Sequence, residues 1–313
     1  MNTYELTSPS GKTYTNMRNV PKETAILAMY MNENGYGGKI GSKTLSCTDL
    51  LKPIKQVIYK LRYPDVYMKD VSSIIRSAKG TAMHKAMSSA LSWWNVDEYI
   101  YDQRTSKVFN GWKISGEFDI VVDGVIKDLK YTSNFSYKKL KEDMDKIQSF
   151  ESLSHLEHNH PTYFKYAMQL SIYKWLNPEL ITKPYGFIIF MLNNGSGFEG
   201  YSIDSEIRFT LFPTEVVEEY IKDRILEIDT YLKNDTLPNC TDTQRGLKPA
   251  EYKLKRMGKN GAMRTVNGSK FTNYQDFKNF VISKGRVGDI EDVSEAQMVI
   301  CDSYCPYTNL CNQ

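Results

Sequence analysis

The stretch SGEFDIVVDGVIKDLK, residues 115–130, decides the fold. Two apolar runs flank Asp123-Gly124, a dipeptide typical of the two-residue turn that joins antiparallel strands. We therefore predict a hairpin of strands over 117–122 and 125–131, preceded by another strand over 107–112. The runs are apolar enough for these strands to be internal in a sheet, where successive side chains point to opposite faces.

Charged side chains interrupt this apolar hairpin. Asp128 and Lys130 are two residues apart and face the same side, and Asp119 lies across the turn on the preceding strand. Two converging carboxylates are hard oxygen ligands of the kind that suits Mg²⁺ or Mn²⁺. Such a cation lowers the pKa of a bound water and stabilises charge on a scissile phosphate, and a neighbouring ammonium orients that water. The alternative is a solvent-facing hairpin, although unpaired charges on an internal strand are costly.

Two predicted helices flank the hairpin. The helix over 71–94 carries His84 four residues after Gly80. The helix over 163–175 carries Gln169 and Tyr173, which share a face because they are four residues apart. Each feature is ordinary when taken alone: a single histidine is as often a satisfied core residue as a ligand, and a Gln–Tyr pair is common on an amphipathic helix.

The remaining patterns predict an α/β chain with a mixed central β-sheet flanked by helices. Further helices are expected over 22–32, 49–59, 136–150 and 214–233, and further strands over 4–7, 185–192 and 198–203. Ser46 or Thr48 would cap the helix that begins near Asp49. We divide the chain into an N-terminal adaptor segment (1–45), a core (46–235) and a small cysteine-containing C-terminal subdomain (236–313).

Taken in order, Gly-x3-His, Gly-x2-Asp, Asp-x-Lys and Gln-x3-Tyr resemble the motifs of the PD-(D/E)XK nuclease superfamily. The chain looks most like its RecB-type exonuclease branch, which includes phage recombination and CRISPR-adaptation exonucleases. The resemblance covers residues 46–235. It implies a restriction-endonuclease-like core and metal-dependent hydrolysis of DNA phosphodiester bonds.

The resemblance also implies a role for each matched position. The catalytic residues are Asp119, Asp128, Lys130, Gln169 and Tyr173, of which the last two hold the DNA strand and order the site. The metal ligands are His84, Asp119, Asp128 and the carbonyl of Leu129. Many relatives carry a Glu three or four residues after the histidine, where this chain has Met87 and Ser88. This departure affects the outer end of the site and not its metal core.

Five cysteines without an export signal fit a reducing cytosol. Cys301, Cys305 and Cys311 are clustered, which indicates a metal site more than a disulfide; the alternative is a flexible tail with incidental cysteines. The family resemblance implies a [4Fe-4S] cluster held by these three and one distant cysteine. We favour Cys240 as that ligand over Cys47, which starts a helix, and zinc is the alternative to iron–sulfur.

The charge of the chain is unevenly distributed. The 313 residues contain 40 Lys+Arg and 37 Asp+Glu, for a formal net charge of +3. Residues 245–286, however, contain eleven basic and two acidic side chains, so the near-neutral total hides a basic block. This block is either a solvated surface or a contact for the phosphate backbone. The candidate DNA contacts in it are Lys253, Lys255, Arg256 and Arg264.

The chain shows no sign of a membrane partner. The first residues lack the basic-then-apolar layout of a signal peptide, and no run of 18 or more apolar residues is present. We therefore expect a cytoplasmic location, in the host cytoplasm if the protein is viral.

Three functions are compatible with these features. The leading one is a Mg²⁺- or Mn²⁺-dependent DNA exonuclease in recombination, repair or replication, acting on single strands or duplex ends; Trp93 and Trp94 are candidates to stack bases, or else simply pack. The second is a non-catalytic DNA-binding module with a nuclease-like fold. The third, compatible with the first, is docking of a helicase or single-strand annealing protein. No phosphate-binding loop is present, so such a partner would be a separate chain.

Overall fold

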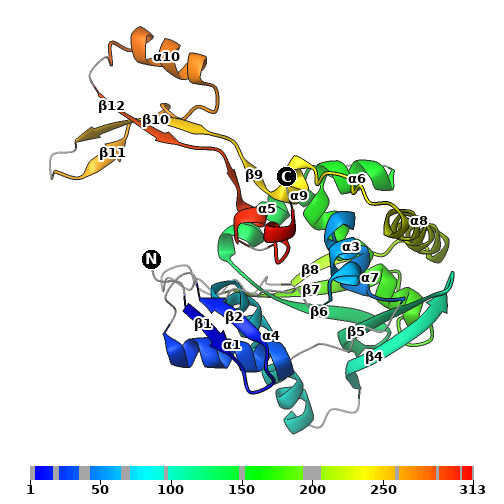
Figure 1. The fold of residues 1–313 in the computed structure, drawn as a ribbon. Coiled ribbons are helices and arrows are strands. Elements are labelled where there is room, and N and C mark those ends of the chain that lie inside the picture. The colour runs from blue at the N-terminus through cyan, green and yellow to red at the C-terminus, as the bar shows by residue number, and fades with distance from the viewer. Residues whose placement is uncertain are drawn as a thin grey trace. The chain divides into compact units, whose positions relative to one another are not determined.

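The hairpin of the sequence forms the centre of a mixed sheet in the computed structural model of the chain (Figure 1). The structure describes residues 4–16, 21–34, 43–64, 71–94, 98–147, 152–192, 206–257, 261–286, 289–303 and 305–311. Among these residues six strands pair in the order β3-β5-β6-β7-β8, with β4 also on β5. They are β3 (Thr44–Ser46), β4 (Tyr99–Phe109), β5 (Trp112–Val122), β6 (Val125–Thr132), β7 (Tyr185–Leu192) and β8 (Glu206–Thr210).

The pairing directions make the sheet mixed. β3 with β5 and β6 with β7 are parallel, and the other pairs are antiparallel. Helices flank the sheet, so the predicted fold class is confirmed. They are α2 (Cys47–Leu50), α3 (Ile54–Arg62), α4 (Val71–Trp94), α5 (Asn134–Met144), α6 (Leu153–Asn159), α7 (Pro161–Leu176) and α8 (Thr214–Lys233). None of the helices in the described ranges is long and apolar enough to cross a membrane.

The predicted turn between β5 and β6 is confirmed. Asp123 and Gly124 both have positive φ, 50° and 75°, as a two-residue hairpin turn requires. Gly124 is also needed for space, because a Cβ there would lie 2.2 Å from Oγ1 of Thr182. The bounds of α4, β7 and α8 agree with the predicted ranges.

Three predicted elements are wrong in detail. The helix expected over 49–59 is two helices, since Pro53 supplies no backbone N–H and disfavours a helical conformation in the residue before it. The strand expected over 107–112 is interrupted by a turn at Asn110-Gly111, where both residues have positive φ, and β4 begins much earlier. The expected helix over 136–150 ends at Met144, and α6 was not predicted. The return strand expected over 198–203 lies outside the described residues.

The core of the sheet lies between the strands and α7, α8 and α3. Its largest fully buried side chains include Trp112, Phe118, Ile126 and Phe209. Cys47 belongs to the same core, with 1% exposure, and its thiol lies 3.7 Å from the backbone carbonyl of Gln169. This burial favours the structural interpretation of Cys47.

The N-terminal segment has a small core of its own. β1 (Tyr4–Thr7) and β2 (Thr13–Asn16) form a hairpin, and α1 (Lys22–Asn34) packs against α4. The contact is made by Ala25, Ala28 and Met29 of α1 with residues at the start of α4. The Gly-rich stretch over 35–41 lies outside the described residues.

The described chain divides into two compact units, residues 1–237 and 238–313; the three-part division made from the sequence stays a prediction. The second unit contains a three-stranded sheet in the order β11-β10-β12 and the helix α10 (Tyr274–Ser283), around a core of Leu254, Phe277 and Val281. The strands are β10 (Glu251–Met257), β11 (Met263–Thr265) and β12 (Ile290–Ser294). Short elements precede and follow this sheet: α9 (Asp242–Arg245), β9 (Leu247–Lys248), β13 (Gln297–Met298) and α11 (Val299–Ser303).

A buried carboxylate joins the start of α2 to α3. Asp49 is 1% exposed and forms a capping box with Ser46. It also pairs with Nζ of Lys60 at 2.6 Å and Nζ of Lys52 at 3.0 Å. Burial alone would raise the pKa of Asp49, but the two ammonium groups hold it well below its usual value.

We predict that Asp49→Asn lowers the free energy of unfolding by ~2–3 kcal/mol, because it leaves the ammonium of Lys60 without its buried partner. Because the pKa of Asp49 is depressed in the folded state, its carboxylate stabilises the fold at pH values above its unfolded-state pKa of about 4. The difference from wild type should therefore shrink as the pH falls below that value. Chemical denaturation across pH measures both effects. Glu206→Gln, which removes an exposed pair with Lys127, is the control and should cost less than about 1 kcal/mol.

Candidate active site

The candidate site lies where β5 and β6 part. Their ladder runs from Val122↔Val125 to Ile120↔Lys127 and is not continued beyond it. The backbone N–H of Leu129 donates instead to Oδ2 of Asp119, at 2.7 Å. The carboxylate thus occupies the position that a backbone carbonyl of β5 would otherwise fill. A 7% exposed Asp119 is in this way fixed at the opening of the sheet.

The other oxygen of Asp119 faces α4. Its Oδ1 lies 3.1 Å from Nδ1 of His84. Burial would lower the pKa of His84, but the carboxylate of Asp119 outweighs this effect and raises it above the ordinary value. The histidine of the predicted flanking helix therefore lies against the hairpin, within reach of its first carboxylate; its role as a metal ligand stays a prediction.

Asp128 and Lys130 lie side by side on β6, as their spacing predicts. Oδ2 of Asp128 is 2.5 Å from Nζ of Lys130. Burial raises the pKa of Asp128, which is 2% exposed, and the ammonium offsets only part of that shift. Burial would lower the pKa of Lys130, but the neighbouring carboxylates outweigh it and raise the pKa. The lysine therefore remains a cation in this site.

The helix α7 contributes an amide and a hydroxyl. Nε2 of Gln169 donates to Oδ1 of Asp128 at 3.3 Å and to the hydroxyl of Tyr173 at 3.0 Å. Both side chains are buried, with 4% and 5% exposure. The Gln-x3-Tyr pair is thus a hydrogen-bonded unit that fixes the orientation of the Asp128 carboxylate.

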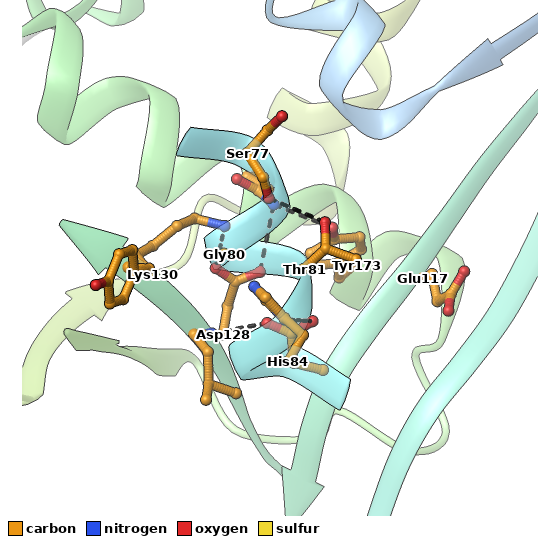
Figure 2. A pocket seen from close by; sticks show the side chains of 12 residues that line it. Ser77, Gly80, Thr81, His84, Glu117, Asp128, Lys130 and Tyr173 are labelled. Atoms are coloured by element: carbon orange, nitrogen blue, oxygen red, sulfur yellow. Dashed lines mark hydrogen bonds and ion pairs between the residues drawn. The ribbon is translucent and has the colours of Figure 1, made fainter. Parts of the chain in front are cut away.

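These side chains line one cavity of about 340 Å³ (Figure 2). Its lining contains every residue predicted as catalytic or as a ligand of the hydrolytic metal: His84, Asp119, Asp128, Leu129, Lys130, Gln169 and Tyr173. The close-up shows α4 crossing the cavity with Ser77, Gly80, Thr81 and His84 on the side that faces it. Four separate elements therefore supply the site: α4, β5, β6 and α7.

Sequence analysis missed part of this lining. Glu117 lines the cavity and forms an ion pair with Arg104 of β4, directly opposite it in the register. Its position two residues before Asp119, on the same face of β5, was the available signal. Ser77 and Thr81 precede His84 by seven and three residues, a helical spacing that could also have identified them.

The donor set fits a hard divalent cation. Oδ2 of Asp128 is buried and is held by the ammonium of Lys130 at 2.5 Å. It lies in a cavity that also contains the carboxylate of Asp119 and the imidazole of His84. As they stand, no three or more His, Cys, Asp or Glu side chains of the described ranges are gathered closely enough to hold a metal ion. A cation would have to compete with the Leu129 N–H and His84 for the oxygens of Asp119.

The cysteines of the second unit lie on neighbouring short elements. None of the described cysteines forms a disulfide. The backbone N–H of Cys305 donates to the carbonyl of Ile300 in α11 at 2.8 Å, and the hydroxyl of Thr308 donates to the carbonyl of Cys301 at 2.6 Å. Burial raises the pKa of the Cys305 thiol, and charge on Cys301 or Cys311 would raise it further. Cys240 lies two residues before α9, which packs against α11.

The four candidate DNA contacts of the basic block lie on two strands but not on one face. Arg256 of β10 is directly opposite Arg264 of β11, whereas Lys253 and Lys255 point to the other face of the sheet. Lys253 pairs with Glu251, and Lys255 pairs with Asp292, both at 2.9 Å. The two arginines are like charges directly opposite each other, an unfavourable arrangement, which the carboxylate of Asp289, 4.0 Å from Nε of Arg256, offsets in part.

Comparisons with known proteins give a limited result. No protein-family model and no curated protein matches the chain. Among solved structures, SSO0001 is similar at a TM-score of 0.43 and 17% identity, over 73% of this chain and 93% of that one. A phage-related exonuclease from Haemophilus somnus 129PT is similar at a TM-score of 0.39 and 14% identity, over 60% of this chain and 93% of that one. Similarity at this level assigns neither a family nor an activity to the chain.

Gly116 allows α7 to approach β5 closely. A Cβ at this position would lie 2.8 Å from Cε1 of Tyr173 and 2.9 Å from Cδ1 of Leu176. We predict that Gly116→Ala lowers the free energy of unfolding by ~1–3 kcal/mol, because the tyrosine ring or the strand must move. Gly80→Ala is the matched control: its Cβ would meet only Tyr131 at 4.0 Å, and alanine is the better helix former. An equal loss in both variants would contradict this account.

Proposed function

We propose that the chain is a metal-dependent nuclease of the PD-(D/E)XK type, of the RecB-like branch. The observation that carries the proposal is the convergence of Asp119, Asp128 and Lys130 in one cavity at the point where β5 and β6 part. Two buried carboxylates beside a lysine fit hydrolysis of an anionic ester better than a structural ion pair, because all three groups line a cavity that a ligand can enter.

The proposed reaction is in-line attack of a water on a DNA phosphodiester. A bound Mg²⁺ or Mn²⁺ would acidify that water and stabilise charge on the phosphate. Asp119, Asp128 and the carbonyl of Leu129 would hold the cation, with His84 as an auxiliary ligand. Lys130, held in place by Asp128, would orient the water or neutralise the charge that develops on the phosphate.

The helix α7 would align this machinery. The hydrogen bond from Gln169 restricts rotation of the Asp128 carboxylate, and the hydrogen bond to Tyr173 holds Gln169 in place. Displacing either would leave the lysine and the carboxylates present but misaligned, and small misplacements of this kind are costly in rate. Both side chains would also contact the DNA strand.

We further propose exonucleolytic action on DNA, as single strands or duplex ends, in recombination, repair or replication of the phage type. Arg256 and Arg264 would bind a backbone phosphate between them, because an anion relieves their mutual repulsion. Lys253 and Lys255 would add contacts on the other face. A separate helicase or single-strand annealing protein would act alongside the nuclease.

The test compares Lys130→Ala and Asp119→Ala with Lys127→Ala, in which a lysine of the same strand but outside the cavity is removed. We predict that the first two variants lose at least about a hundredfold in DNA cleavage, and that the control cleaves like wild type. A chelator should abolish cleavage by wild type, and Mg²⁺ or Mn²⁺ should restore it. DNA binding without cleavage under any of these metals would establish the non-catalytic alternative instead.

We also propose that Cys240, Cys301, Cys305 and Cys311 hold a [4Fe-4S] cluster with a structural role. The support is the short sequence spacing of the three terminal cysteines and the packing of α9, next to Cys240, on α11. The four side chains would have to move together to bind the cluster. Zinc bound by the same four thiolates is the alternative.

We predict a brown protein that contains iron and acid-labile sulfide when it is purified without oxygen. Cys301→Ser should remove the iron and lower the melting temperature, since metal binding and folding are linked. Cys47→Ser should leave the iron content unchanged, because this thiol is buried in the core of the first unit. A colourless protein with bound zinc would identify the other metal, and loss of iron from Cys47→Ser would refute the ligand set.

A further inference from the structure

The C-terminal end of α4 exposes two neighbouring tryptophans. Trp93 and Trp94 are 80% and 69% exposed, and their ring centroids lie 5.9 Å apart. The packing role that adjacent tryptophans on a helix usually have is therefore contradicted. Removing apolar surface of this kind from water is favourable by roughly 25 cal/mol per Å² buried. Two such rings side by side indicate a contact that is made in a complex.

The same helix leads from this pair to the catalytic cavity. Ser77, Gly80, Thr81 and His84 of α4 line the cavity. Trp93 and Trp94 follow His84 by nine and ten residues, which corresponds to ~14–15 Å along a helix axis and places them about half a turn and about a quarter turn from the His84 direction. Along the helix axis the pair therefore lies about four stacked nucleotides beyond His84.

The charge of α4 indicates what the helix contacts. Its 24 residues contain no Asp or Glu and include the exposed Lys79 and Lys85. A positively charged helix without carboxylates complements a polyanion. Basic side chains together with exposed aromatic rings are typical of surfaces that bind single-stranded nucleic acid, because every base offers a face for stacking.

We propose that α4 guides a single strand of nucleic acid into the cavity, and that Trp93 and Trp94 stack its bases. The direction of the strand towards Asp119 and Asp128 rests on the proposed nuclease function; the stacking site does not. At about 3.4 Å per stacked nucleotide, the span from His84 to Trp94 accommodates about four nucleotides. The bases of a duplex are already stacked on one another, so the platform selects unpaired strands.

The other two tryptophans make this site measurable. Trp112 and Trp175 are 1% and 3% exposed, and their indole N–H groups donate to Asp229 and Glu218. Quenching of tryptophan fluorescence by an added oligonucleotide therefore reports on the exposed pair. The full-length protein is titrated in the presence of a chelator of divalent metals. The titrants are oligothymidylates shorter and longer than about four nucleotides and a duplex of matched length.

We expect strong quenching by the longer oligonucleotides, and weak quenching both by the shorter ones and by the duplex. In an anisotropy assay with the longer oligonucleotide, Trp93→Ala/Trp94→Ala should weaken binding about tenfold or more. Trp93→Phe/Trp94→Phe should retain most of the affinity, since phenylalanine still stacks. Tyr63→Ala, which removes an exposed aromatic ring at the end of α3, is the control and should bind like wild type.

Quenching that does not depend on length or strandedness, or unchanged binding by the double alanine variant, would overturn the proposal. So would a double variant that differs from wild type only in oligomeric state, because the pair would then be a subunit contact. Failure of the nuclease function has a different signature: length-dependent quenching in a protein that cleaves nothing with any metal. Cleavage without that quenching would keep the nuclease and refute the platform.

Discussion

The candidate site depends on the hydrogen bond from the Leu129 N–H to the carboxylate of Asp119. A β-ladder that continued past Ile120 and Lys127 would satisfy this donor with a backbone carbonyl and would leave no room between the strands. A side-chain acceptor lets the strands separate while the buried N–H remains bonded, as the cost of an unsatisfied amide requires. The opening in the sheet and the placement of its first carboxylate are therefore one structural event.

The rest of the first unit supports that opening from two directions. On one side α4 brings the imidazole of His84 against Asp119. On the other, α7 packs closely on β5, because Gly116 has no side chain, and carries Gln169 to Asp128. Neither carboxylate depends on a loop for its orientation, since each is held by a helix and a strand. Such rigid placement is what a site needs when it must bind a charged ester in a fixed position.

Much of this site could be predicted from local patterns. The Asp123-Gly124 turn set the register that brings Asp119 across from Asp128, and a spacing of four placed Gln169 and Tyr173 on one helix face. What could not be predicted depends on contacts between elements. The ion pair of Glu117 with Arg104, for example, depends on the pairing of β5 with β4, a strand whose start carries no strong pattern. The placement of Arg264 opposite Arg256 likewise required the strand pairing of β10 with β11. The break between α2 and α3, in contrast, is indicated in the sequence by Pro53.

The buried thiol of Cys47 can serve as a chemical probe of local opening in the first unit. It is the one cysteine in the sequence of residues 1–237, it contacts the backbone of Gln169, and burial raises the pKa of its thiol. A thiol reagent can reach it only when α2 and α7 separate. The rate of its modification therefore reports the free energy of local opening at the base of the cavity. Ligands that tighten the cavity would slow that reaction without touching the sulfur.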